Sequence, residues 1–114
     1  MSRMAWPVCR CPAHRPHDIL TALRRGRAFV LSIQRPEGSW YGSWGVCFTY
    51  GTWFGCKALR ATGDTAARSA AQRAALEFLL SKQQDDGGWG ESYLSCQDKA
   101  YSQLPGAIVS AAAL

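Results

Sequence analysis

The feature that most constrains the fold is an internal repeat with a period of 49 residues. The turn Gln34-Arg-Pro-Glu-Gly38-Ser-Trp40 returns as Gln83-Gln-Asp-Asp-Gly87-Gly-Trp89, and the segments before the two turns align without a gap. A fixed period of this length is typical of stacked helical units, none of which can bury its apolar face alone. The repeat therefore predicts an all-α array.

Apolar spacing predicts a helix before each turn and one between them. The first helix is expected to begin with Asp18 as its N-cap and to end before Pro36. The second is expected from about Gly45 to Thr62, with Gly63 as its C-terminal cap. The helices and turns alternate, as in an α/α array.

The third helix is expected to be capped by Asp64 or Thr65 and to run to Lys82, and a fourth segment should follow Pro105-Gly106. Two units are fewer than the roughly three that a repeat array usually needs for stability. We therefore expect a fragment, with an irregular segment over residues 1–17 and a partial repeat domain over residues 18–114.

The net charge of +5 does not indicate a nucleic-acid-binding surface. Residues 1–35 hold seven Arg and one Asp, whereas residues 36–114 hold six basic and seven acidic residues. Because the excess lies in the leader and not in the repeats, no nucleic-acid partner is expected. An unstructured start is the simpler interpretation of this Arg-rich leader, with a transit peptide as the alternative.

The five cysteines are odd in number and irregularly spaced, which favours a reducing compartment. Cys9, Cys11, His14 and His17 are metal-ligand residue types, but the chain between them is too short to fold around an ion as zinc sites do. We expect no metal and no cofactor. No apolar stretch approaches the roughly 18 residues of a membrane span, although peripheral membrane association stays open.

The repeated Gln, Gly and Trp are expected to fasten units together and not to contact a ligand. A Gln amide can donate to the last carbonyls of a helix, a Gly can turn the chain, and a Trp can cover the turn. These structural positions are Gln34, Gly38, Trp40, Gln83, Gly87 and Trp89.

The motif Arg25-Gly26-x-x-Phe29-x-x-x-x-Gln34-x-x-x-Gly38-x-Trp40 resembles the QW repeat of squalene and oxidosqualene cyclases. The block Gly38-Ser-Trp-Tyr-Gly-Ser-Trp-Gly-Val-Cys-Phe-Thr-Tyr-Gly-Thr-Trp-Phe-Gly55 is similar to a stretch of eukaryotic oxidosqualene cyclases. The block from Phe78 to Lys99 is similar to the plant branch, which includes cycloartenol and β-amyrin synthases. The resemblance covers residues 24 to about 104.

The resemblance implies part of an α/α barrel, in which outer and inner helices alternate around a cavity. The family reaction, an isomerisation, cyclises 2,3-oxidosqualene to a sterol or triterpene alcohol through carbocations, which aromatic faces stabilise. By resemblance, Trp44 and Tyr50 match cavity aromatics of the family. The implied location is peripheral, at the endoplasmic reticulum membrane or lipid droplets, and otherwise cytoplasmic. The product is not readable from these residues.

One departure from the family concerns the general acid that starts cyclisation, an Asp in an Asp-Cys-Thr-Ala-Glu motif. That motif is absent here, and Ser95-Cys-Gln-Asp98 belongs to a different segment. We therefore expect this chain to be inactive alone. Three acidic residues near the second turn are expected to cap helices in solvent without a catalytic role: Asp85, Asp86 and Glu91. Three aromatic residues are expected to pack in the core: Phe48, Trp53 and Phe54.

Two alternatives remain open. A protein prenyltransferase β-subunit also has Gln and Gly-Gly turns in an α/α barrel, but it needs a zinc site with a downstream His, and no His follows His17. The other is a non-catalytic helical-repeat module whose aromatic stripe binds a partner protein.

Overall fold

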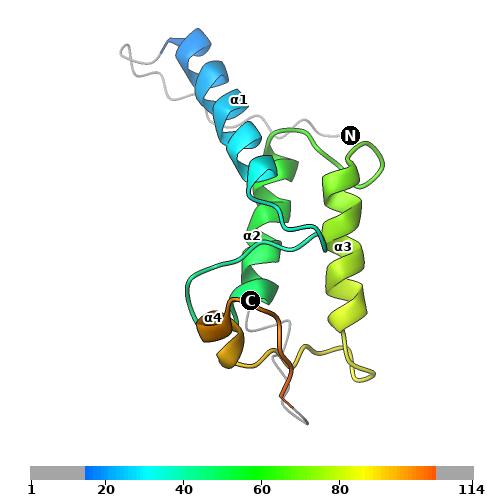
Figure 1. The fold of residues 1–114 in the computed structure, drawn as a ribbon. Coiled ribbons are helices and arrows are strands. Elements are labelled where there is room, and N and C mark those ends of the chain that lie inside the picture. Colours follow the sequence, from blue (N-terminus) through cyan, green and yellow to red (C-terminus); the bar gives the residue numbers. More distant parts are fainter. Residues whose placement is uncertain (1–14, 105–114) are drawn as a thin grey trace.

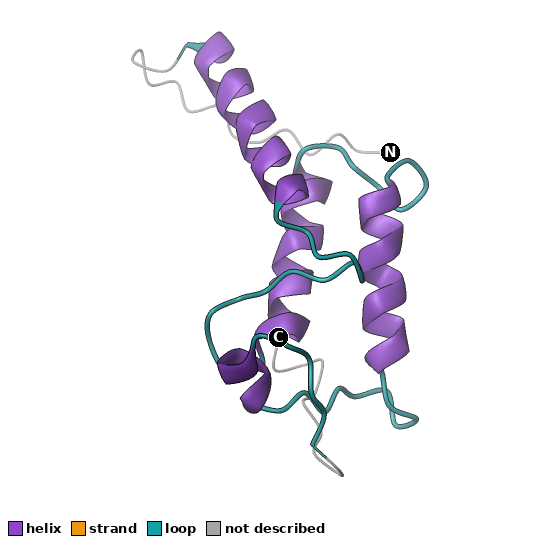
Figure 2. Ribbon diagram, in the orientation of Figure 1, coloured by secondary structure: helices purple, strands orange, loops and turns teal. Residues whose placement is uncertain are grey.

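The computed structural model describes residues 15–104 of the 114-residue chain. Within them lie four helices and no strand, and Figures 1 and 2 show α2 and α3 side by side, with α1 extending away from them. The helices are α1 (Pro16–Ser32), α2 (Cys47–Ala61), α3 (Ala70–Lys82) and α4 (Leu94–Asp98). The predicted all-α fold and the order of the first three helices and two turns are confirmed, whereas α4 was not predicted. The segment expected after Pro105 lies outside the described residues, as do Cys9, Cys11 and His14.

Two predicted helix starts are wrong. Helix α1 begins at Pro16, because proline needs no N–H partner in the first turn, and Asp18 lies inside that turn and not at the N-cap. Helix α3 is capped by Ser69, whose hydroxyl accepts a hydrogen bond from the Gln72 amide at 3.3 Å. The predicted C-terminal cap of α2 is confirmed, since Gly63 has φ 98°.

The two glutamines make the same hydrogen bond in the two turns. Gln34 Nε2 donates to the carbonyl of Gly38 at 2.9 Å, and Gln83 Nε2 donates to the carbonyl of Gly87 at 2.8 Å. Both glycines have positive φ, 96° and 87°, a conformation that other residues rarely adopt. Each Gln therefore closes its own turn. The expectation that these glutamines donate to the last carbonyls of their own helices is wrong.

The tryptophans satisfy the helix ends instead. Trp40 Nε1 donates to the carbonyl of Val30 at 2.8 Å, and Trp89 Nε1 donates to the carbonyl of Leu79 at 2.9 Å. Both carbonyls lie in the last turn of a helix, where intrahelical partners run out, although that of Leu79 also accepts from the Gln83 amide at 3.1 Å. The predicted role of the two indoles, which cover a turn and a polar helix end, agrees with this geometry.

Trp40 is the centre of the core between the helices. It is 4% exposed and packs with Leu59 of α2 and Ala75 of α3. Its ring lies directly on Gly55, where an added Cβ would be 2.4 Å from the indole, and its carbonyl lies on Gly51. Two glycines one helical turn apart therefore make the groove of α2 that receives the first repeat.

The first turn also contacts the helix of the second repeat. Gln34 Nε2 donates to the carbonyl of Ala71 in α3 at 2.9 Å. Gly38 lies so close to Ala74 that an added Cβ would be 2.3 Å from its carbonyl oxygen. The first repeat is thereby fastened to the second through main-chain atoms.

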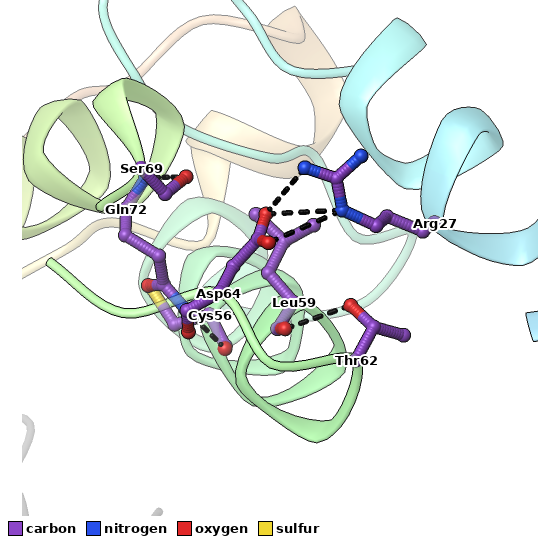
Figure 3. A network of polar contacts seen from close by, with 7 residues as sticks. All are labelled: Arg27, Cys56, Leu59, Thr62, Asp64, Ser69 and Gln72. Carbon is purple, nitrogen blue, oxygen red and sulfur yellow. Dashed lines mark hydrogen bonds and ion pairs between the residues drawn. The ribbon is translucent and has the colours of Figure 1, made fainter. Parts of the chain in front are cut away.

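An ion pair ties α1 to the loop that connects α2 and α3 (Figure 3). The guanidinium of Arg27 donates to both carboxylate oxygens of Asp64, with the shortest bond at 3.0 Å. Beside it, Gln72 Nε2 donates to the carbonyl of Cys56 at 2.8 Å and links α3 to α2. Asp64 is thus engaged by α1 and is not the cap of α3.

Helix α2 buries its small and polar side, and Phe48 and Leu59 are the only large side chains in that face. The buried residues are Cys47, Phe48, Thr49, Gly51, Thr52, Gly55 and Leu59. Phe48 packs in the core as predicted, but Phe54 is 58% exposed and Trp53 is half-buried. The expectation that Phe54 packs in the core is wrong for the described part of the chain, because Trp40 occupies the opposite, glycine-lined side.

Over residues 15–104, no helix is both long and apolar enough to cross a bilayer.

Replacing Gly55 with alanine should lower the free energy of unfolding by about 2 kcal/mol, because the new methyl would overlap the Trp40 ring in a packed core. Gly26→Ala is the matched control. Gly26 lies within α1, nothing lies within 4 Å of its Cβ position, and alanine favours helix by about 1 kcal/mol, so this variant should be more stable. Chemical denaturation measures the free energy of unfolding of both variants. Equal changes in the two would contradict the claim that the Trp40 ring packs against Gly55.

Candidate active site

The structure brings Trp44 and Tyr50 together at the start of α2. The Trp44 amide donates to the Tyr50 hydroxyl at 2.9 Å, so the loop before α2 is tied to the first turn of the helix. Gly42 lies against the Tyr50 ring, where an added Cβ would be 2.4 Å from ring atoms. Tyr50 is half-buried, whereas the Trp44 side chain is 82% exposed. The loop therefore positions Trp44 but does not cover its ring.

Two more rings continue from Tyr50 along α2. The Tyr50 and Phe54 rings are 6.0 Å apart at 87°, and the Trp53 and Phe54 rings are 4.7 Å apart at 65°, both edge-to-face arrangements. Lys57 Nζ lies 4.8 Å from the centroid of Trp53. We call the side chains of Trp44, Tyr50, Trp53 and Phe54 the open aromatic face. One of its rings already faces a cation.

The described residues form a wall at this place and not an enclosed cavity. A hollow of about 520 Å³ lies elsewhere, between the first turn, the end of α3 and residues 100–101, and its lining includes Arg35, Lys82 and Tyr101. No residue of the open aromatic face lines it. A closed site around Trp44 therefore needs further chain.

Glu91 caps the N-terminus of α2 from inside the protein. It is 2% exposed, and its carboxylate accepts hydrogen bonds from the amides of Phe48 and Thr49 at 2.8 and 2.7 Å and from the Thr49 hydroxyl at 2.5 Å. The expectation that Glu91 caps a helix was correct in kind, but the cap is buried and not in solvent. A negative charge at this end also complements the helix dipole.

The segment after the second repeat turn thus fixes the start of α2, and with it Tyr50. The main chain beside Glu91 is itself held, because the Ser92 amide donates to the carbonyl of Ser102 at 2.8 Å. Sequence reasoning missed this role, although a signal existed: the N-cap of α2 is Val46, which offers no side-chain acceptor. The free amides of such a helix start need another acceptor, which for a buried start is a side chain from elsewhere in the chain.

Two other groups near Glu91 have raised pKa values. Burial, and then the Glu91 carboxylate, raise the pKa of the Cys47 thiol from 9.0 to about 12. The same two causes, in the same order, raise the pKa of the Tyr101 hydroxyl from 10.0 to about 12. Both groups are therefore neutral near pH 7. A neutral Cys47 fits a packing role and not a nucleophile.

The remaining predicted residues are placed as follows. The six repeat positions lie at the two turns: Gln34, Gly38, Trp40, Gln83, Gly87 and Trp89. Asp86 accepts a hydrogen bond from the Gly88 amide at 2.9 Å, and Asp85 is exposed. Among residues 15–104, no three His, Cys, Asp or Glu side chains are grouped so that they could hold a metal ion.

Glu91→Ala should lower the free energy of unfolding by about 3 kcal/mol, because it leaves the buried amides of Phe48 and Thr49 without acceptors. Asp85→Ala, at an exposed position of the neighbouring turn, should change it by less than about 0.5 kcal/mol. Urea denaturation of the two variants tests the cap, and a loss below about 1 kcal/mol for Glu91→Ala would argue against it.

Stability should fall in alkaline solution between about pH 9 and 12. The Cys47 thiol of the unfolded chain ionises near pH 9, whereas the folded thiol keeps its proton until about pH 12, so rising pH favours unfolding in this window. Cys47→Ala should have a shallower pH dependence of the free energy of unfolding than the native chain. Identical slopes in the two proteins would refute the contribution of Cys47.

Comparison with known proteins identifies the family. The model of the squalene-hopene cyclase C-terminal domain matches residues 12–113. The chain is 48% identical to lanosterol synthase of Aspergillus fumigatus over 92 residues, 81% of this chain and 12% of that protein. It is 48% identical to human lanosterol synthase over 97 residues, 82% of this chain and 13% of that protein.

A clubmoss protein is similar to the same degree. Alpha-onocerin synthase of Lycopodium clavatum is 45% identical over 95 residues, 83% of this chain and 12% of that protein. The chain thus spans about an eighth of the length of these relatives. They come from a fungus, an animal and a clubmoss, so the predicted plant-like subtype stays a prediction. The predicted family is confirmed: the chain belongs to the squalene-hopene cyclase C-terminal domain family.

Proposed function

We propose that this chain forms part of the cavity wall of an oxidosqualene cyclase, in which 2,3-oxidosqualene is cyclised to a sterol or triterpene alcohol. The observation that carries the proposal is the exposed Trp44 ring. The Trp44 amide donates to the Tyr50 hydroxyl, which holds Trp44 at the start of α2, and the next outward residues of that helix are also aromatic. The relatives' names, two lanosterol synthases among them, support this substrate class.

The open aromatic face suits carbocation chemistry. A cyclising polyene carries positive charge from carbon to carbon and must be kept from water, so the wall has to attract cations without supplying a nucleophile. Aromatic faces do this, and a desolvated cation over one ring gains about 2 kcal/mol. The ammonium of Lys57 over Trp53 is an example of the same attraction on this helix.

The initiating acid is a separate part of the proposal. The sequence holds no Asp-Cys-Thr-Ala-Glu motif, and the best-placed buried carboxylate, Glu91, is occupied by two amides and a hydroxyl. We therefore assign the wall to this chain and the proton donor to another part of the enzyme. The peripheral membrane location implied by the resemblance stays a prediction.

The test is a chimera of human lanosterol synthase in which the matching region is replaced by residues 24–104 of this chain. The 48% identity makes the exchange feasible. The chimera should cyclise 2,3-oxidosqualene, and Trp44→Ala in it should lower kcat about thirtyfold with little change in KM, the effect of losing ~2 kcal/mol of transition-state stabilisation. Trp44→Phe should recover part of the loss, because it restores an aromatic face.

Tyr93→Ala is the matched control, since Tyr93 is also an exposed aromatic residue but lies at α4. It should leave kcat unchanged. A folded, active chimera in which Trp44→Ala has the kcat of Tyr93→Ala would exclude Trp44 from the cavity. A folded chimera without any cyclase activity would contradict the proposed function itself.

A further inference from the structure

The contact between the two repeats can be described as two complementary surfaces. One is the turn side of the first repeat, where Gln34 donates to the Ala71 carbonyl and Gly38 lies against Ala74. The other is the face of α3 that receives this turn. Because the repeat has a period of 49 residues, each surface has an equivalent elsewhere in the chain.

The second repeat shows the turn side again, but uncovered. Gly87 has the backbone conformation of Gly38, yet within the described residues its Cβ position meets only the side chain of Gln83, at 3.9 Å. Leu80, which corresponds to the half-buried core residue Leu31, is 67% exposed. The turn side of the second repeat is thus built like the first, and none of the four described helices lies against Gly87.

Helix α1 shows the receiving face again, also uncovered. Its Ala22, Arg25 and Gly26 correspond to Ala71, Ala74 and Ala75 of α3, and all three are exposed. Helix α1 has no fully buried residue. Phe29 is 62% exposed, whereas its equivalent Phe78 is 5% exposed. The chain therefore carries both halves of its internal contact a second time, at opposite ends of the array.

The two uncovered surfaces also carry opposite charges. If the turn of one molecule lay on α1 of another as the first turn lies on α3, Gly87 would contact Arg25. Asp85 and Asp86 directly precede Gly87, so the arginine would meet an acidic turn. At this position the internal contact has a neutral alanine, Ala74. The arginine that α1 has in place of this alanine is therefore suited to a contact with the acidic turn.

We propose that a second copy of this chain docks head to tail on the first, with the Gln83–Trp89 turn and Leu80 of one molecule on α1 of the next. Gln83 would donate to the Ala22 carbonyl as Gln34 donates to that of Ala71. Such a contact uses two different surfaces, so it is heterologous and extends or closes into a ring. The proposal depends on the internal repeat and not on cyclase activity.

Sedimentation velocity of the full 114-residue chain, over a wide range of concentration, tests the association. The weight-average mass should rise with concentration. Leu80→Asp should weaken the association at least tenfold, because it places a charge in the contact, whereas Tyr93→Asp should leave it unchanged. The two positions are equally exposed, at 67%, and circular dichroism checks that both variants keep their helices.

A charge exchange tests the orientation. Asp85→Lys and Arg25→Glu should each weaken self-association, because each variant sets like charges against each other. A mixture of the two should associate again, since every contact between unlike molecules then pairs opposite charges. A mass of one chain at every concentration would overturn the proposal. So would equal losses in Leu80→Asp and Tyr93→Asp, or a mixture that fails to associate.

Discussion

The fold depends on the packing of one indole, that of Trp40, in a glycine-lined groove of α2. The ring lies on Gly55, its main chain lies on Gly51, and its N–H satisfies the last turn of α1. One side chain thus joins three elements, and the turn that this ring holds in place fastens the first repeat to α3. Larger residues at the two glycines would overlap Trp40 and weaken this junction.

A second constraint comes from the opposite direction along the chain. The first repeat packs on the middle of α2, whereas Glu91 of the second repeat holds its N-terminus. Between them they leave one side of α2 uncovered, and this side carries Tyr50, Trp53 and Phe54. The partly open aromatic side of α2 is therefore a consequence of how both repeats bind this helix.

The sequence predicted the three long helices, the turns and the equivalence of the two repeats, because these depend on local spacing and on glycine, but it did not predict α4. It did not predict which side of α2 is buried. Counting apolar residues favours Phe54 for the core, but the core is decided by where Trp40 fits, and that is the side with Gly51 and Gly55. Trp44 and Tyr50 were found by resemblance, and the hydrogen bond between them has no signal in their spacing.

Glu91 shows the same limit at the candidate site. Its partners, Phe48 and Thr49, are more than forty residues away, and only the missing cap at Val46 pointed to them. The most direct test of the account is amide hydrogen exchange at these two residues, measured by NMR. We predict that both amides exchange only through global unfolding, while the His17 amide in the first turn of α1, which no side chain of residues 15–104 caps, exchanges fast. Fast exchange at Phe48 and Thr49 would contradict the claim that the second repeat fixes the start of α2.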